Sequence, residues 1–176
     1  MNETGAAPGD SERAFLSWLG FWGQFLVLGT SDLTKDLHAV ATRDRLPLIT
    51  ALSLAMLAAR AHGLAILDGV HLDLSDEEGF ALVCRQGREL GFDGKTVIHP
   101  MQIGPANIAF APSAAEIEWS RRIIAAHAAA AAAGKGVVLV DGKLIEGLHV
   151  ENARRLLGLV EGIEQIASVD TPGHAV

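Results

Sequence analysis

Short apolar runs alternate with longer amphipathic stretches from Phe25 onward, and this alternation predicts strands that are each followed by helices. Three short runs predict strands. Residues 25–28 and 64–67 are continuously apolar, as in strands of a parallel sheet buried on both faces, and residues 95–98 form the third predicted strand. Stretches with helical character follow them, over residues 30–37, 47–62, 76–90, 101–110 and 113–133. The pattern predicts right-handed βαβ units around a parallel sheet, an α/β fold.

Polar residues and glycines mark the expected helix ends. Residues 30–32, Asp76 and Ser113 offer side chains that can cap the helix starts, and Gly91 is placed to stop the helix before it. After residue 134 the pattern changes to two short apolar runs joined by Asp141-Gly142. An Asp-Gly pair between such runs predicts a β-hairpin, and a last amphipathic helix is expected over residues 149–167.

Composition and charge narrow the functional classes. The 176 residues carry a formal net charge of -7 and no basic patch, which argues against nucleic-acid binding. The N-terminus lacks a basic region before an apolar core, so we expect no signal peptide. The longest apolar stretch, residues 48–67, is interrupted by Arg60 and His62, so we expect no membrane span. The single cysteine, Cys84, excludes an intrachain disulfide and is expected to be a small buried apolar residue, which fits a cytoplasmic protein.

Reactive groups of a parallel α/β sheet gather at the carboxyl ends of its strands. Asp32 follows the first predicted strand; it can cap the next helix or bind a hard cation, and carboxylate ligands favour Mg²⁺ or Mn²⁺. The stretch from Asp68 to Asp73, with His71, forms either a polar face above the sheet or a solvated turn. His99 follows the third strand and is expected to be structural. The sequence has no zinc-ligand spacing, phosphate-binding loop or nucleophile elbow.

Four segments, in order, resemble the HpcH/HpaI aldolase–citrate lyase superfamily. Residues 28–33 (Leu-Gly-Thr-Ser-Asp-Leu) are similar to the Gly-x-x-Asp-Leu segment of citrate lyase β-subunits and malyl-CoA lyases. Residues 91–103, followed by Asn107 and 110–112, resemble the segment at the last barrel strand of that family. Residues 140–145, with His149, resemble its C-terminal lid. Between them, residues 65–68 with Asp73 and Asp76 fall in the expected place.

The resemblance implies the last three β/α units of a TIM (β/α)₈ barrel with a C-terminal lid extension. On this basis residues 25–133 form a partial barrel and residues 134–168 the lid. Residues 1–24, rich in glycine, proline, acidic and aromatic residues, form an atypical N-terminal segment, and residues 169–176 a tail. The complete family forms trimers or hexamers, so the resemblance also implies a homo-oligomer.

The resemblance further implies a Mg²⁺-dependent CoA-ester lyase that cleaves malyl-CoA or citramalyl-CoA by Claisen-type chemistry. Asp32 matches the family's metal-binding aspartate, and Asp141 matches the lid aspartate that acts as acid or base on the acetyl carbon. Two alternatives stay open: a malyl-CoA thioesterase on the same scaffold, and a non-catalytic module that pairs with a full-length paralogue. The first five family strands, including the metal-binding glutamate and a substrate-binding arginine, have no counterpart here. Glu3-Thr4 resembles the family's Glu-Thr at that glutamate but lacks a preceding strand. We therefore expect an incomplete fragment, inactive by itself.

Overall fold

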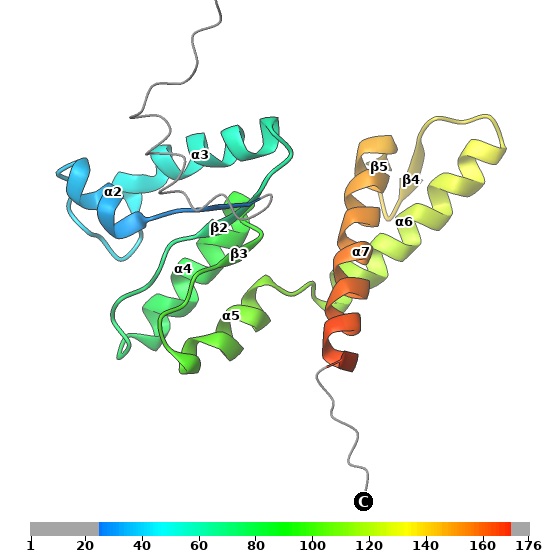
Figure 1. Cartoon of the computed structure of the whole chain (residues 1–176). Helices are drawn as coiled ribbons and strands as arrows, with labels where there is room; N and C mark the ends of the chain where they lie inside the picture. Colours follow the sequence, from blue (N-terminus) through cyan, green and yellow to red (C-terminus); the bar gives the residue numbers. More distant parts are fainter. Residues whose placement is uncertain (1–24, 170–176) are drawn as a thin grey trace, which may run out of the picture. The chain divides into compact units, whose positions relative to one another are not determined.

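A computed structural model describes residues 25–169 of the chain. The chain divides after Phe110 into two compact units, and each is described by itself. The first contains β1 (Phe25–Val27), α2 (Thr30–Asp36), the 3-10 turn η1 (Leu46–Leu48), α3 (Ile49–Ala61), β2 (Ala65–Asp68), α4 (Glu77–Leu90), β3 (Gly94–Lys95), the 3-10 turn η2 (Pro100–Gln102) and α5 (Ile103–Phe110) (Figure 1). The second contains α6 (Ala114–Ala132), β4 (Val138–Val140), β5 (Lys143–Ile145) and α7 (Gly147–Val169).

The first unit is built on a parallel sheet with strand order β1-β2-β3. Phe25 lies opposite Ala65, and Leu67 lies opposite Gly94. Because helices connect successive parallel strands, the prediction of an α/β fold with a parallel sheet is confirmed.

Strand β3 is shorter than the predicted run of residues 95–98. The Thr96 amide still donates to the Asp68 carbonyl at 2.9 Å, but the Ile98 amide turns to the side-chain oxygen of Gln102, at 3.0 Å. The His99 Nδ1 accepts from the Met101 amide at 3.3 Å and starts η2, in agreement with its expected structural role. The chain therefore leaves the sheet after Thr96, two residues before the predicted strand end.

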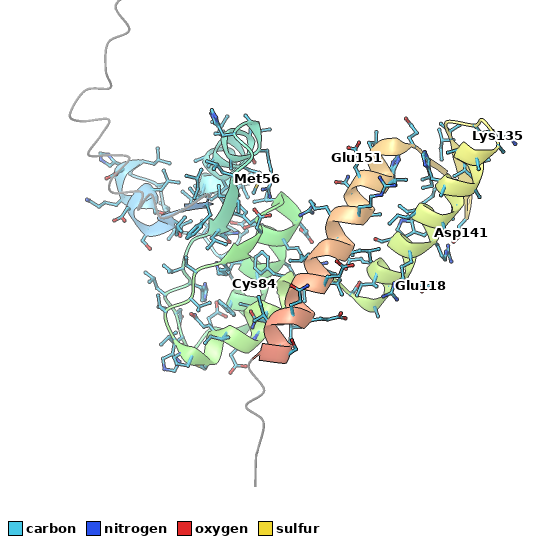
Figure 2. All side chains as sticks on the ribbon, turned by 45° about the vertical axis from the view of Figure 1, so that its right-hand side comes forward. Met56, Cys84, Glu118, Lys135, Asp141 and Glu151 are labelled. Atoms are coloured by element: carbon cyan, nitrogen blue, oxygen red, sulfur yellow. The ribbon has the colours of Figure 1, made fainter. Side chains whose placement is uncertain are left out.

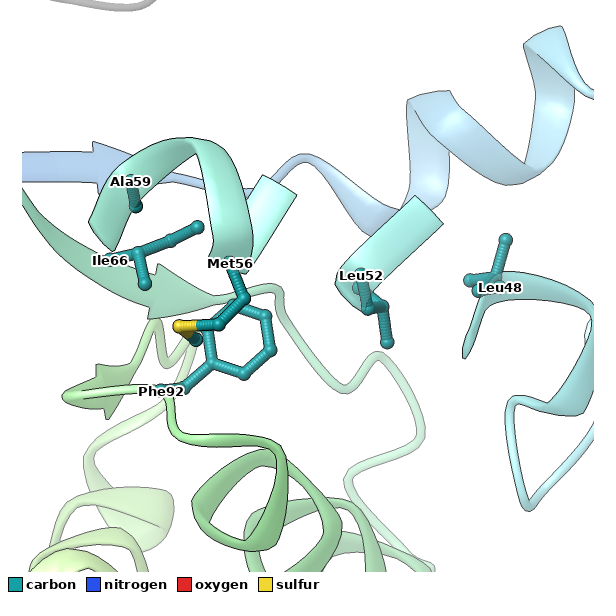
Figure 3. Packing of buried hydrophobic residues seen from close by; sticks show 6 residues of the cluster. All are labelled: Leu48, Leu52, Met56, Ala59, Ile66 and Phe92. Carbon is teal, nitrogen blue, oxygen red and sulfur yellow. The ribbon is translucent and has the colours of Figure 1, made fainter. Parts of the chain in front are cut away.

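Helix α3 supplies one side of the main core. Leu52, Met56 and Ala59 recur at helical spacing and pack with Ile66 of β2 and with Phe92 (Figure 3). A second cluster joins Phe80, Val83 and Cys84 of α4 to Ala106 of α5. Cys84 is fully buried, as predicted, and its burial raises the pKa of the thiol.

The helix starts follow the predicted chemistry in two cases and depart from it in one. Asp76 caps α4 by accepting from the Gly79 amide at 2.9 Å, and Ser113 caps α6 in a capping box with Glu116. Helix α2 instead begins after Gly29, and no side chain caps it. The expectation that residues 30–32 provide the cap is wrong, because all three already lie inside the helix.

In the second unit the β4–β5 hairpin packs against α6 and α7, and the two helices also pack on each other. Val138 pairs with Ile145, and a core of Ile123, Ile145, Val150 and Ala153 joins the elements. Asp141 and Gly142 have φ values of +49° and +75°, as a type I′ hairpin turn requires. Helix α6 thus packs with the hairpin and α7; the boundary at residue 134, drawn for the complete family fold, stays a prediction.

No helix within residues 25–169 is long and apolar enough to cross a membrane. The expectations about Glu3-Thr4, about the N-terminal segment of residues 1–24 and about the tail beyond residue 169 fall outside the described residues.

Candidate functional site

Asp32 lies at the carboxyl end of the sheet, in the first turn of the helix that follows β1. Its side chain is exposed and does not cap α2. Within residues 25–169 no hydrogen bond or ion pair engages its carboxylate. Of the two roles that spacing allowed for Asp32, capping is therefore excluded, and the carboxylate stays open to a ligand.

Asp68, the last residue of β2, has the opposite environment. Its side chain is fully buried, 2.7 Å and 2.8 Å from Arg45 Nη1 through its two oxygens and 3.2 Å from Lys95 Nζ. The Lys95 side chain is fully buried too, and desolvation lowers its pKa. We call Arg45, Asp68 and Lys95 the buried charge cluster. It corrects the expectation that Asp68 belongs to a solvent-facing polar surface or a solvated turn.

The buried charge cluster fixes the loop before η1. Arg45 has a left-handed φ of +54°, an uncommon conformation for a long side chain. Its guanidinium also donates to Gln86 Oε1 at 2.7 Å and to the Val83 carbonyl at 3.3 Å, both on α4. Because these contacts hold the side chain from several directions, the structure sustains the unfavourable backbone.

Two glycines permit close approach around Asp68. A Cβ atom on Gly87 of α4 would lie 2.8 Å from Asp68 Oδ2, and one on Gly69 would lie 2.2 Å from Thr30 Oγ1. The Gly69 backbone is held on both sides, because its amide donates to Asp68 Oδ1 and its carbonyl accepts from Lys95 Nζ. The loop after β2 is therefore fixed against the start of α2, the helix that carries Asp32.

An open hollow of about 670 Å³, here the edge hollow, lies at this end of the sheet. It is lined by Thr30, Ser31, Thr34, Val40, Ala41, Thr42, Arg43, Arg45, Leu48, His71, Leu72, Asp73 and Asp76. Among described residues, His71 Nε2 is buried without a hydrogen-bond partner, and its ring packs on Phe80 at 5.9 Å. Hydrogen bonds from Ser75 lower the pKa of Asp73. His71 and Asp73 thus reach the hollow as a polar face would, whereas Asp68 does not.

The residues of the sheet edge fit a magnesium ion only in part. Residues 25–169 hold no group of three or more histidine, cysteine, aspartate or glutamate side chains placed to bind a metal. Mg²⁺ is usually held by one or two carboxylates, with water and substrate oxygens completing its shell. Asp32 fits as one ligand of such a site, and the other ligands have to come from outside this part of the chain.

Asp141, the predicted acid or base, lies in the second unit at the tip of the hairpin (Figure 2). Its carboxylate is exposed and forms an ion pair with Arg122 of α6. The Arg122 guanidinium lies 5.3 Å from the centre of the Trp119 ring, and Lys143 Nζ lies 5.2 Å from it. Asp32 and Asp141 therefore belong to separate units.

Sequence reasoning did not single out Arg45, Lys95 or Arg122. A carboxylate that ends the apolar run Ala65-Ile66-Leu67 could have signalled a need for cations, since buried charges are usually paired. The identity of those cations lies in tertiary contacts 23 and 27 residues away along the chain.

Comparison with known proteins shows the family to which the chain belongs. The HpcH/HpaI aldolase/citrate lyase model matches residues 24–100. The (3S)-malyl-CoA thioesterase of Cereibacter sphaeroides is 51% identical over 138 residues, which cover 78% of this chain and 48% of that protein. The chain belongs to the HpcH/HpaI aldolase/citrate lyase family. Within this family, citrate lyase subunit beta of Escherichia coli is 34% identical over 136 residues, covering 77% of this chain and 45% of that subunit.

Solved structures of the family agree with the fold. Protein CitE from Mycobacterium tuberculosis, in complex with magnesium, acetoacetate and coenzyme A, aligns with a TM-score of 0.63 at 31% identity, over 75% of this chain and 50% of that one. A citrate lyase from Burkholderia xenovorans aligns with a TM-score of 0.68 at 21% identity, over 87% of this chain and 50% of that one, which supports the fold alone. The chain spans about half the length of the family relatives it matches.

Proposed function

We propose that the chain serves Mg²⁺- or Mn²⁺-dependent carbon–carbon cleavage of a CoA ester of the malyl-CoA or citramalyl-CoA type. The observation that carries this proposal is the Asp32 carboxylate. It lies at the carboxyl edge of a parallel sheet, does not cap α2, and has no hydrogen-bond or ion-pair partner among the described residues. Its neighbours Ser31 and Thr34 line the edge hollow. A carboxylate kept free at such an edge is suited to bind a hard cation.

Asp32 would be the residue of this chain that holds the metal ion, and a bound Mg²⁺ would supply electrostatic stabilisation of the charge that shifts during cleavage. The edge hollow, at about 670 Å³, falls in the usual size range of small-molecule sites and receives the acid portion. In the cleavage direction Asp141 donates a proton to the carbon that becomes the methyl group of acetyl-CoA, while the substrate hydroxyl gives up its proton to solvent as it becomes the carbonyl of the oxo acid.

The proposal has three further parts, which follow from the resemblance of the sequence to the family. The three strands and their helices correspond to the last units of a (β/α)₈ barrel, residues 134–168 act as its lid, and copies assemble as trimers or hexamers. The solved CitE protein binds magnesium, acetoacetate and coenzyme A, and this ligand set suits the proposed CoA-ester chemistry.

Hydrolysis of malyl-CoA is a second candidate, and a specific observation favours it. The relative named (3S)-malyl-CoA thioesterase is 51% identical to this chain, whereas the citrate lyase subunit is 34% identical. Both reactions use the same ester and differ in the bond that breaks. Cleavage gives glyoxylate and acetyl-CoA, and hydrolysis consumes water and gives malate and free CoA.

The test joins the full chain behind the N-terminal half of the Cereibacter sphaeroides thioesterase and supplies malyl-CoA with Mg²⁺. We expect glyoxylate and acetyl-CoA, and loss of both on removing the metal with a chelator and their return when Mg²⁺ is restored. Malate with free thiol in equal amounts would establish the second candidate instead. Absence of both product pairs from a folded, Mg²⁺-loaded fusion would refute the proposed substrate class.

A further inference from the structure

Asp141 pairs with Arg122 of α6, a residue that the resemblance to the family did not single out. We propose that Arg122 is the positioning residue of Asp141: it fixes the direction of the carboxylate at the hairpin tip for proton transfer. This inference rests on the proposed function of Asp141.

Both ends of the ion pair stand on fixed backbone. Arg122 lies within α6, and the next residue, Ile123, is buried in the core against Ile145 of β5. Asp141 opens the type I′ turn, whose two left-handed residues leave the tip little freedom. The backbones of α6 and of the hairpin turn therefore hold Arg122 and Asp141 at the positions from which their side chains pair.

The Trp119 ring gives the Arg122 guanidinium a second contact that restricts its position. Trp119 precedes Arg122 by three residues, so the two side chains lie on the same face of α6. The ring also receives Lys143, two residues after Asp141, so α6 and the hairpin tip share one aromatic surface. A planar guanidinium that stacks on a ring and pairs with a carboxylate has few orientations left.

Because the ion pair is exposed, its effect on turnover can be distinguished from its effect on the stability of the fold. The side chains of Arg122 and Asp141 are 44% and 64% exposed, and exposed ion pairs add little to the free energy of folding. Misplacing a reacting group by about 1 Å, however, can lower a rate about 10²-fold. The contact is therefore expected to affect turnover far more than thermal stability.

Arg121 provides a matched control. It is exposed, adjacent on the same helix, and within residues 25–169 it has no hydrogen bond or ion pair. Methionine is nearly as good a helix former as arginine, so Arg122→Met and Arg121→Met differ mainly in the contact with Asp141.

The first measurement is amide hydrogen exchange of the fusion described above, which contains the full chain, read by mass spectrometry over peptides that cover residues 138–145. Arg122→Met should accelerate exchange at the hairpin tip several-fold, and Arg121→Met should not. Equal exchange in the two variants would overturn the claim that Arg122 holds the tip.

The second measurement is turnover of malyl-CoA in the fusion described above. Arg122→Met should lower kcat about tenfold or more and change KM less than about threefold, because it misplaces a reacting group without removing a binding contact. Arg122→Lys should recover part of the rate, and Arg121→Met should match the parent. In an Asp141→Asn background Arg122→Met should have no further effect, since the two residues act as one unit.

The outcomes separate the two proposals. If Asp141→Asn lowers kcat and Arg122→Met does not, the inference about Arg122 fails and the role of Asp141 stands. If Asp141→Asn leaves kcat unchanged, the role of Asp141 fails, and the function of Arg122 in turnover fails with it. If Arg122→Met slows the Asp141→Asn variant as much as the parent, Arg122 acts on something other than Asp141.

Discussion

At the scale of single residues, Asp32 and Asp68 are the same side chain at the ends of neighbouring strands, used in opposite ways. Asp68 is buried and satisfied by Arg45 and Lys95, so it has no capacity left for a ligand. Asp32 is exposed, and none of the described residues pairs with it. The environment, and not the residue type, separates a structural carboxylate from a candidate ligand.

The proposed metal role of Asp32 is tested by Asp32→Ala in the fusion with the thioesterase N-terminal half. We expect metal-dependent cleavage to be abolished and Mn²⁺ binding, measured by electron paramagnetic resonance, to weaken, because one of few carboxylate ligands is lost. Asp36→Ala is the control, since Asp36 lies on the same helix, is exposed and pairs only with Lys35 within the described residues. Near-normal activity of Asp32→Ala at low Mg²⁺ would show that the ligand is another residue.

For Asp141, the substitution by asparagine keeps the shape of the side chain and removes its basicity. Turnover should fall roughly 10²–10⁴-fold, the usual contribution of a general acid or base. Substrate affinity should change little, because the proposed role is proton transfer and not binding. Initial rates over a series of malyl-CoA concentrations measure both quantities. A tenfold or greater rise in KM with unaltered kcat would assign Asp141 to binding.

The buried charge cluster predicts a large stability effect at a position without a proposed catalytic role. Asp68→Ala leaves the buried Lys95 and the largely buried Arg45 without their anion, and breaking a buried pair in this way costs about 3–5 kcal/mol. Asp36→Ala removes a carboxylate from an exposed pair and should cost at most about 1 kcal/mol. Urea unfolding of both variants measures the difference. Equal midpoints would mean that the cluster does not stabilise the first unit.

At the scale of elements, local chemistry predicted the caps of α4 and α6 correctly, but it gave the wrong cap for α2 and the wrong end for β3. Asp76 and Ser113 cap the helices that their spacing predicted, because a cap depends only on residues three positions apart. The end of β3 depends instead on Gln102, whose side chain takes the Ile98 amide away from the sheet. The residues of a strand alone carry no information about such a competing acceptor.

The Asp76 cap makes the stability of α4 depend on pH. The Gly79 amide, first, and the Arg43 guanidinium hold the pKa of Asp76 below its usual value. The stabilisation is therefore fully present above the unfolded-state pKa, about 3.9, and is lost as pH falls through the lower folded-state value. Asp76→Asn keeps a capping oxygen and removes this titration. Its midpoint of thermal unfolding should lie below that of the parent at pH 7, and the gap should close toward pH 2. A gap independent of pH would contradict the assignment.

At the scale of the whole molecule, the 176-residue chain by itself is expected to have no appreciable lyase activity. Its described residues offer one candidate metal carboxylate and no metal-binding group of three side chains. Large apolar side chains are also exposed on the first unit, including Leu54, Leu57 and Ile108, and such surface favours self-association.

Size-exclusion chromatography should therefore show aggregate or a broad oligomer, with no Mg²⁺-dependent release of acetyl-CoA from malyl-CoA. A monodisperse preparation that turns over the ester at about 1 s⁻¹ or faster, an ordinary enzyme rate, would contradict this expectation.

The sequence predicted the parallel sheet, the order of the helices and the hairpin turn, because each depends on local pattern. Resemblance to a family, and not spacing, selected Asp32 and Asp141; spacing left Asp32 undecided between a cap and a ligand. Arg45 and Arg122 could not be predicted, because their partners Asp68 and Asp141 lie 23 and 19 residues away and are brought near by tertiary packing. Long-range pairs of this kind have no periodic trace in one sequence.

The hairpin turn also exposes the protein to a slow covalent modification during storage. In an Asp-Gly sequence the glycine amide can attack the aspartate side chain with little steric hindrance, lose water to form a cyclic imide, and reopen with water as isoaspartate. Asp141 is exposed and is followed by Gly142, which has no side chain to obstruct this route. The rearrangement would lengthen the main chain inside a two-residue turn and shorten the side chain that carries the carboxylate. A stored sample would thus lose the proposed proton-transfer group through one covalent isomerisation that leaves its mass unchanged.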